Sequence, residues 1–147
     1  MLISLGYIGL FIGTFVSATL FPTPSEVFVI GAYELEYNVV LVLIVASIGN
    51  LLGGLTNYYL GYKATNSDGL KKRFKLNQTK IDKWEVKLKK YGYWLGLISW
   101  LPAIGDPMVG VLGFFKVKFW PLAITMFIGK TARYIVLTII YFYFQSP

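Results

Sequence analysis

Long apolar stretches alternate with short polar interruptions along this chain. The apolar segments lie at about 2–21, 39–62, 91–115 and 119–144. The first of them contains no charged residue, and roughly 20 apolar helical residues are enough to cross the hydrocarbon core of a bilayer. No Lys or Arg precedes Lys63, whereas a cleaved signal peptide begins with a basic region. We therefore expect an all-α integral membrane protein that retains its first segment.

Two of the polar interruptions contain prolines. FPTPSE follows the first apolar segment, and WLPAIGDP divides the third. Proline removes a backbone donor and disfavours helix at the residue before it, so both motifs should unwind the chain. Unwound backbone survives at membrane depth only where protein or a water-filled cavity covers it. We predict two re-entrant hairpins, and the prolines at their tips are Pro22, Pro24, Pro102 and Pro107.

Prolines, carboxylates and glycines recur at matching positions in the two halves of the chain, at an offset of 80 residues. The matching pairs are Pro22 with Pro102, Glu26 with Asp106, and Gly49 with Gly129. Broken segments in matching positions of two halves indicate a transport site at the interface of inverted repeats. Within a single membrane domain, 1–147, we expect repeats at 1–62 and 91–147, each a re-entrant hairpin plus one spanning helix. Whether the first apolar run instead spans fully is left open.

The net charge of +7 is concentrated in residues 63–90, which join the two repeats. This connector holds ten of the fourteen basic residues and three of the seven acidic ones. Basic loops between membrane segments stay on the cytoplasmic side. Four full spans would place Lys116 and Lys118 outside, against this rule, so the charges favour the hairpin topology. A nucleic-acid patch is the competing interpretation of such a basic run, and we expect no nucleic-acid partner.

Part of the connector, NQTKIDKWEVKLKKY, has apolar residues at helical spacing and lysines around them. This pattern predicts an amphipathic helix on the cytoplasmic leaflet, close to anionic lipid headgroups. A solvated connector is the alternative.

The composition excludes several kinds of chemistry. The chain has no Cys and no His, which removes disulfides, thiolate nucleophiles, Cys/His metal sites and imidazole acid–base catalysis. We therefore expect no enzyme, no metal and no organic cofactor.

Three motifs are similar to a known family. GGLTNYYLG, LPAIGDP and GKTARY together resemble the DedA superfamily (the VTT or SNARE-associated Golgi protein domain), and most of all its small bacterial YqaA-type branch. The resemblance covers nearly the whole chain outside the basic connector. It implies a multi-pass protein of the bacterial inner membrane with two inverted repeats. It also implies movement of lipids or lipid-linked phosphates between leaflets, often tied to the proton gradient.

The resemblance carries over to single residues. Pro24, Ser25 and Glu26 match the first-hairpin Pro-Gly-Glu of the family, which implies that Glu26 is the hairpin carboxylate. Gly61 and Gly113 also match family glycines. The chain departs from the family at Gly54, where the family has an aspartate, and at Ser99 and Gly105, where it has arginines. In their place the chain has Asp106 beside the second tip, and Lys130 and Arg133 on the last helix.

The candidate transport residues are the charged and amide side chains of these segments: Glu26, Asp106, Lys130, Arg133, Asn50 and Asn57. A charge at the centre of a bilayer costs about 2.5–3.5 kcal/mol on insertion scales, so Lys130 and Arg133 should face the interior and pair with Glu26 and Asp106. We expect a charged cavity that admits a headgroup phosphate, with Arg133 as forked donor and Glu26 as a proton-coupled switch.

Simpler roles stay open for the same residues. The carboxylates would also suit helix N-termini, the ion pairs would also suit a purely structural role, and Asn50 and Asn57 would also suit bonds between helices. The sequence predicts movement of a lipid or lipid-linked phosphate between leaflets. The alternatives are a small proton-coupled ion or solute transporter and a membrane-integrity or assembly factor without transport. The expected partners are membrane lipids with anionic headgroups, and the sequence is compatible with a homo-oligomer.

Overall fold

The computed structural model of the protein describes residues 2–19, 24–64, 78–101 and 104–146. Its helices are α1 (Leu2–Ser17), α2 (Glu26–Glu34), α3 (Val39–Ala64), α5 (Gln78–Tyr91), the 3₁₀ helix η1 (Gly92–Trp100), α6 (Gly105–Phe114) and α7 (Phe119–Gln145). The described residues contain no strand, so the all-helical fold class is confirmed for this part of the chain.

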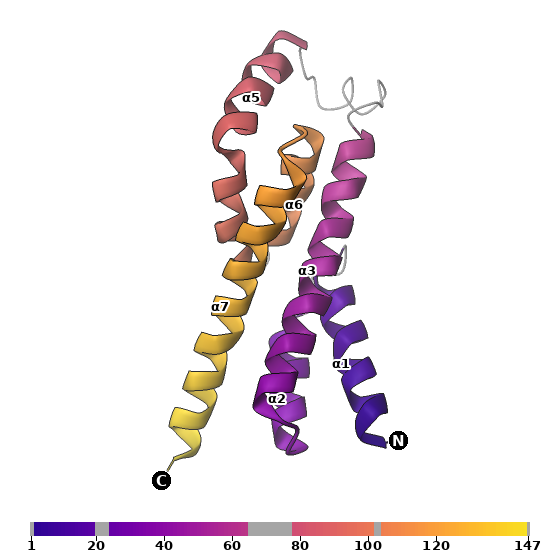
Figure 1. The fold of residues 1–147 in the computed structure, drawn as a ribbon, viewed down its shortest axis with the longest axis vertical. Coiled ribbons are helices and arrows are strands. Elements are labelled where there is room, and N and C mark those ends of the chain that lie inside the picture. Colours follow the sequence, from indigo (N-terminus) through magenta and orange to yellow (C-terminus); the bar gives the residue numbers. More distant parts are fainter. Residues whose placement is uncertain (1, 20–23, 65–77, 102–103, 147) are drawn as a thin grey trace.

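The helices run roughly along the long axis of the molecule. Figure 1 shows both termini and the α2–α3 turn at one end, which we call the terminal end, and α5 and the α6–α7 turn at the opposite end. α1 runs from the terminal end to about the middle of the molecule, and η1 reaches a similar level from the α5 end. α3 and α7 run most of the length between the two ends.

The order of elements is the same in both halves of the chain: α1, α2 and α3, then η1, α6 and α7. The correspondence extends to the turns before α3 and α7. Glu36 and Lys116, 80 positions apart, are the described non-glycine residues with positive φ, at 60° and 56°. The amide that follows each of them closes the turn with the same hydrogen bond, from Tyr37 to the Ala32 carbonyl and from Val117 to that of Leu112.

Two predicted apolar segments form less regular helix than expected. α1 ends at Ser17, not near residue 21, and Ala18 and Thr19 are in a turn. The Ser17 hydroxyl donates to the Thr14 carbonyl, and the Ala18 amide donates to that of Phe15, so the last turn tightens and the helix stops. The third segment is divided, with 3₁₀ helix before the break and α6 after it.

Two of the four predicted tip prolines belong to the described residues. Pro22 and Pro102 lie outside the described residues. Pro24 directly precedes Ser25, the N-cap of α2, and Pro107 lies in the first turn of α6. Both positions suit proline, because backbone N–H groups at a helix N-terminus have no intrahelical acceptor.

α3 is the central helix, and glycines bring its neighbours close. It packs against α1 on one side and against α6 on another. A Cβ on Gly53 would meet the Phe15 carbonyl of α1, and one on Gly61 would meet the Gly110 carbonyl of α6. Gly113 lies in the same way against the Tyr58 backbone. Small residues at these positions let the helix backbones approach, as helix packing within membranes favours.

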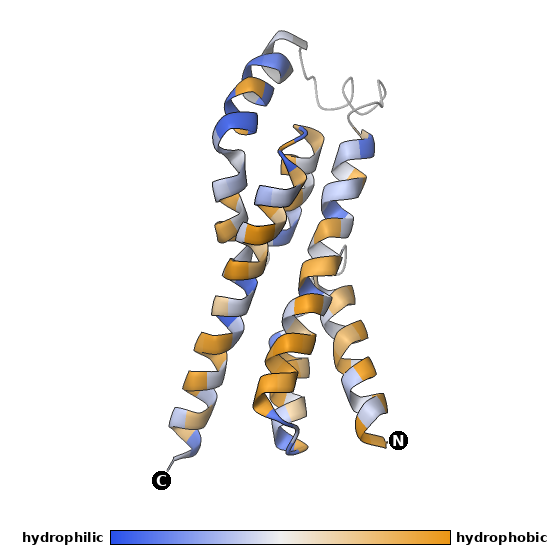
Figure 2. Cartoon of the chain, in the orientation of Figure 1, coloured by the Kyte–Doolittle hydropathy of each residue, from blue (hydrophilic) through white to orange (hydrophobic). Residues whose placement is uncertain are grey.

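Buried apolar residues form two clusters. One joins α1, α2, α3 and α7 around Leu10, Val29 and Val42, and the other joins α3, α6 and α7 around Val109, Leu122 and Met126. Large apolar side chains also cover much of the outer surface, and Figure 2 shows hydrophobic colour along α1, α3 and α7 and hydrophilic colour on much of α5. α3 and α7 are long and apolar enough to cross a membrane.

Candidate functional site

The two tip carboxylates lie at the starts of the two short helices and point to α7. Glu26 is the first residue of α2 and Asp106 the second residue of α6. Each pairs with a cation of α7: Asp106 with Lys130 and Glu26 with Arg133. Lys130 and Arg133 are three positions apart, so they lie on one side of the helix. The N-cap residues Ser25 and Ile104 make no side-chain cap hydrogen bond.

Lys130 is fully buried and has two polar side-chain partners. Its Nζ lies 2.7 Å from Asp106 Oδ1 and also donates to Asn50 Oδ1. The Lys130 side chain is 0% exposed and that of Asp106 19%. Asn50 in turn donates to the Thr14 carbonyl of α1, over 3.2 Å. One cation therefore joins α3, α6 and α7, and the amide connects this group to α1.

Arg133 has a more open environment. Its guanidinium pairs with Glu26 and makes a long contact of 3.5 Å to Ser25 Oγ. The side chains of Arg133 and Glu26 are 12% and 26% exposed. A guanidinium has five N–H donors in a planar fork, which suits carboxylate or phosphate oxygens. The Arg133–Glu26 pair thus keeps donor capacity next to an accessible surface.

Asn57 lies between the end of α1 and the start of α6. Its Nδ2 donates to the Ala18 carbonyl, over 2.8 Å, and to the Asp106 carbonyl, over 3.3 Å. Its Oδ1 is buried without a hydrogen-bond partner in the described part of the chain. Asn57 therefore contacts the backbone after α1 and the backbone of α6, and within the described part of the chain its side chain makes no hydrogen bond to the side chains of either ion pair.

Sequence reasoning missed the part that Tyr134 and Gly54 play in this region. Tyr134 is fully buried and donates to Ser25 Oγ over 2.9 Å, so it ties the start of α2 to α7. Gly54 borders the Asp106–Lys130 pair: a Cβ there would lie 2.8 Å from Met126 Cε, 3.3 Å from Lys130 Cε and 3.5 Å from Asp106 Oδ1. The signal for Tyr134 is its spacing of four residues from Lys130, which places both on one helix face.

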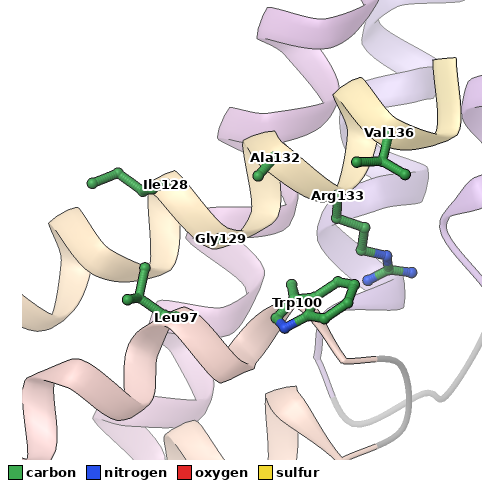
Figure 3. A pocket seen from close by; sticks show the side chains of 7 residues that line it. All are labelled: Leu97, Trp100, Ile128, Gly129, Ala132, Arg133 and Val136. Carbon is green, nitrogen blue, oxygen red and sulfur yellow. The ribbon is translucent and has the colours of Figure 1, made fainter. Parts of the chain in front are cut away.

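An open groove of about 340 Å³ lies between η1 and α7. Its lining residues are Leu97, Trp100, Ile128, Gly129, Ala132, Arg133 and Val136. Figure 3 shows the Arg133 side chain and the Trp100 indole on the same side of α7. Arg133 thus belongs both to the groove and to the ion pair with Glu26.

The described residues have no group of three or more His, Cys, Asp or Glu side chains that would hold a metal ion. The charged side chains brought together here are carboxylates and cations in pairs.

Comparison with known proteins extends over nearly the whole chain. The family model described as VTT domain matches residues 1–143. The "Inner membrane protein YqaA" of Escherichia coli (strain K12) is 35% identical over 138 residues, which cover 90% of this chain and 88% of that protein. An uncharacterized protein of Haemophilus influenzae is 29% identical over 137 residues, covering 87% of this chain and 82% of its own.

An uncharacterized protein of Methanocaldococcus jannaschii is 32% identical over 132 residues, which cover 88% of this chain and 79% of that protein. No solved structure matches the chain. The family resemblance inferred from GGLTNYYLG, LPAIGDP and GKTARY is confirmed by the family model and by the Escherichia coli relative. The chain belongs to the VTT domain (DedA) family.

Proposed function

We propose that this protein is a multi-pass protein of the bacterial inner membrane that moves a lipid or a lipid-linked phosphate between leaflets. The observation that carries the proposal is the pairing of both tip carboxylates, one from each half of the chain, with cations of α7. Charges in an apolar helix bundle are costly and mark ion or substrate pathways. The name of the Escherichia coli relative supports the membrane assignment, as do the lengths and hydropathy of α3 and α7.

In the proposed topology α3 and α7 span the bilayer, and α1–α2 and η1–α6 are re-entrant hairpins of two inverted repeats. The topology is supported by Figure 1, in which α1 and η1 run inward from opposite ends and finish near the middle of the molecule. Glu26 and Asp106 would then lie at mid-depth, where non-helical backbone is tolerated only if protein or water covers it. The matching positive φ values of Glu36 and Lys116 support the relation between the repeats.

Charge gives this topology a direction. Glu34 and Glu36 belong to the end of α2 and the turn after it, at the terminal end. The end of α3, the helix α5 and the turn before α7 carry lysines at the opposite end. Under the positive-inside rule we assign the α5 end, with residues 63–90, to the cytoplasm. α5 extends past the ends of α3 and α6 in Figure 1, and its contact with the cytoplasmic leaflet stays a prediction.

The two ion pairs would have different tasks. The Asp106–Lys130–Asn50 group is held around a fully buried cation, which suits a fixed connection between the repeats. The Arg133–Glu26 pair is more exposed, so a phosphate could replace or share the Glu26 carboxylate on the guanidinium fork. Protonation of Glu26 would release Arg133 for the substrate, which makes Glu26 the candidate for proton coupling. This mechanism needs no metal or organic cofactor.

The test is lipid transfer in vesicles that contain the purified full-length protein and leaflet-resolved fluorescent lipids. We expect transfer with the natural chain, and loss of at least about 100-fold in rate for Arg133→Ala, because the charge-assisted bonds to phosphate are removed. Lys83→Ala, a change of an exposed lysine on α5, is the control and should keep the natural rate. Unchanged transfer in properly inserted Arg133→Ala protein would reject the role of Arg133.

The same vesicles separate the alternatives. Dissipation of an imposed pH gradient without lipid transfer would favour a proton-coupled transporter of a small ion or solute. If neither activity is seen, a membrane-integrity or assembly factor is favoured, for which the fully buried Lys130 group would be a structural lock.

A further inference from the structure

The groove between η1 and α7 exists because α7 has small residues where η1 packs against it. Gly129 is buried, and a Cβ there would lie 2.8 Å from the Leu97 carbonyl, so the two helices are already in close contact at this point. One turn further along, Ala132 leaves room beside Trp100. The space of about 340 Å³ therefore follows from the sequence Gly-Lys-Thr-Ala at positions 129–132.

The groove surface is almost wholly apolar, and Arg133 lines it chiefly with the aliphatic part of its side chain. Besides Arg133, the lining residues are aliphatic, aromatic or glycine. Trp100, Ile128 and Val136 are 47%, 54% and 52% exposed, so the groove opens on the same apolar outer surface that the long helices present. In Figure 3 the Arg133 side chain extends past the Trp100 ring, with its guanidinium beyond the indole. One side chain therefore connects this outer groove with Glu26.

We propose that this groove binds one hydrocarbon chain of an anionic phospholipid, with the phosphate of the headgroup on Arg133. The proposal rests on the proposed function in placing this face of the molecule in the bilayer. Its occupant follows from charge complementarity: apart from the Trp100 indole N–H, the apolar walls offer a water-soluble anion no side-chain donor, and a neutral hydrocarbon leaves the guanidinium without a new partner. Glu26 uses only part of the five-donor fork, so a phosphate oxygen can join it.

The first test uses photolabelling in phosphatidylcholine vesicles that contain a small fraction of phosphatidic acid with a diazirine in one acyl chain. We expect label on Leu97, Trp100 and Val136. Ala132→Phe fills the groove, and excluding about two methylene groups of the chain should lower this labelling roughly tenfold. Ile139→Phe, at an exposed position of α7 outside the groove, is the matched control and should stay within about twofold. If Ala132→Phe does not insert, Val136→Trp fills the groove instead.

The second test addresses the charge. The phosphatidic acid probe should label the groove about tenfold more than a phosphatidylcholine probe with the same chain, because its phosphate carries no choline cation and can take a second negative charge, which strengthens the charge-assisted hydrogen bonds from Arg133. The double variant Glu26→Gln/Arg133→Gln removes both charges and leaves neither one unpaired, and we expect it to abolish this preference. Competition by free phosphate would show a site for the soluble anion and would overturn the assignment to a lipid.

Three further outcomes overturn the proposal: equal loss of label in Ala132→Phe and Ile139→Phe, label spread over all exposed faces of α7, or cross-links between two copies of the chain at the groove. The measurements can reject the groove site and the proposed function independently of each other. Groove labelling without lipid transfer keeps the site and rejects the proposed function. Lipid transfer that is unaffected by filling the groove keeps the function and rejects the site.

Discussion

Lys130 and Arg133 lie three positions apart on one helix and have different surroundings. The Lys130 side chain is completely buried and bound to Asp106 and Asn50, whereas the Arg133 side chain reaches an open groove. A buried cation without partners would be strongly destabilising, so Lys130 depends on Asp106 and Asn50 for its burial. The second has partners that a substrate could replace.

The difference leads to a prediction on stability. Lys130→Met leaves Asp106 and the Asn50 carbonyl without their buried partner, and we expect a loss of about 3–5 kcal/mol in the free energy of unfolding. Lys130→Met/Asp106→Asn removes both charges and should recover a large part of this loss. Unfolding in detergent, followed by circular dichroism, measures both variants. A double variant as unstable as the single one would show that the pair does not act as a unit.

At the scale of helices, glycines decide which faces of α3 meet α1 and α6. The backbones approach so closely that added methyl groups at Gly53 and Gly61 would meet carbonyl oxygens. A carbonyl in a helix cannot turn aside without breaking its hydrogen bond, so the helices themselves would have to move apart.

We therefore expect Gly61→Ala to destabilise the protein by about 1–3 kcal/mol, the usual cost of overpacking. Gly9→Ala is the matched control on α1, because a Cβ at that position meets nothing within 4 Å. It should be neutral or stabilising by up to about 1 kcal/mol, since alanine favours helix over glycine. The same unfolding measurement in detergent applies. Equal effects of the two substitutions would contradict close packing of α3 on α6.

The helices themselves were largely predictable. The apolar segments expected at 39–62 and 119–144 are α3 and α7, because unbroken apolar runs of this length satisfy their backbone hydrogen bonds locally. The end of α1 and the 3₁₀ form of η1 were not predicted. They depend on side-chain bonds such as that of Ser17 to Thr14 and on packing against α7.

At the scale of the whole molecule, the turns before α3 and α7 lie at opposite ends and carry opposite charges. Glu36 belongs to the turn at the terminal end, and Lys116 to the equivalent turn at the α5 end. Their matching backbone conformations at opposite ends are what two inverted repeats would produce, and the proposed topology places one turn outside and the other in the cytoplasm.

Because the chain has no natural cysteine, single introduced cysteines report this topology directly. We expect Glu36→Cys and Ser146→Cys to react with a membrane-impermeant maleimide added to intact cells. Lys87→Cys and Lys116→Cys should react only after the membrane is opened. Reaction of Lys116→Cys in intact cells would favour four full spans and contradict the re-entrant hairpins.

The sequence by itself determined the helical class, the offset of 80 residues, the family and the identity of the charged groups, because each depends on local patterns. Only the tertiary structure decided that Asp106 takes Lys130 while Glu26 takes Arg133, that Tyr134 binds Ser25 and that Asn57 contacts both breaks of the chain. Ser25 and Tyr134 are 109 positions apart, and the groove lies between two separate helices. Such contacts depend on how closely the helix backbones approach one another. Small residues and packing set that distance, and no periodic pattern in the sequence reveals it.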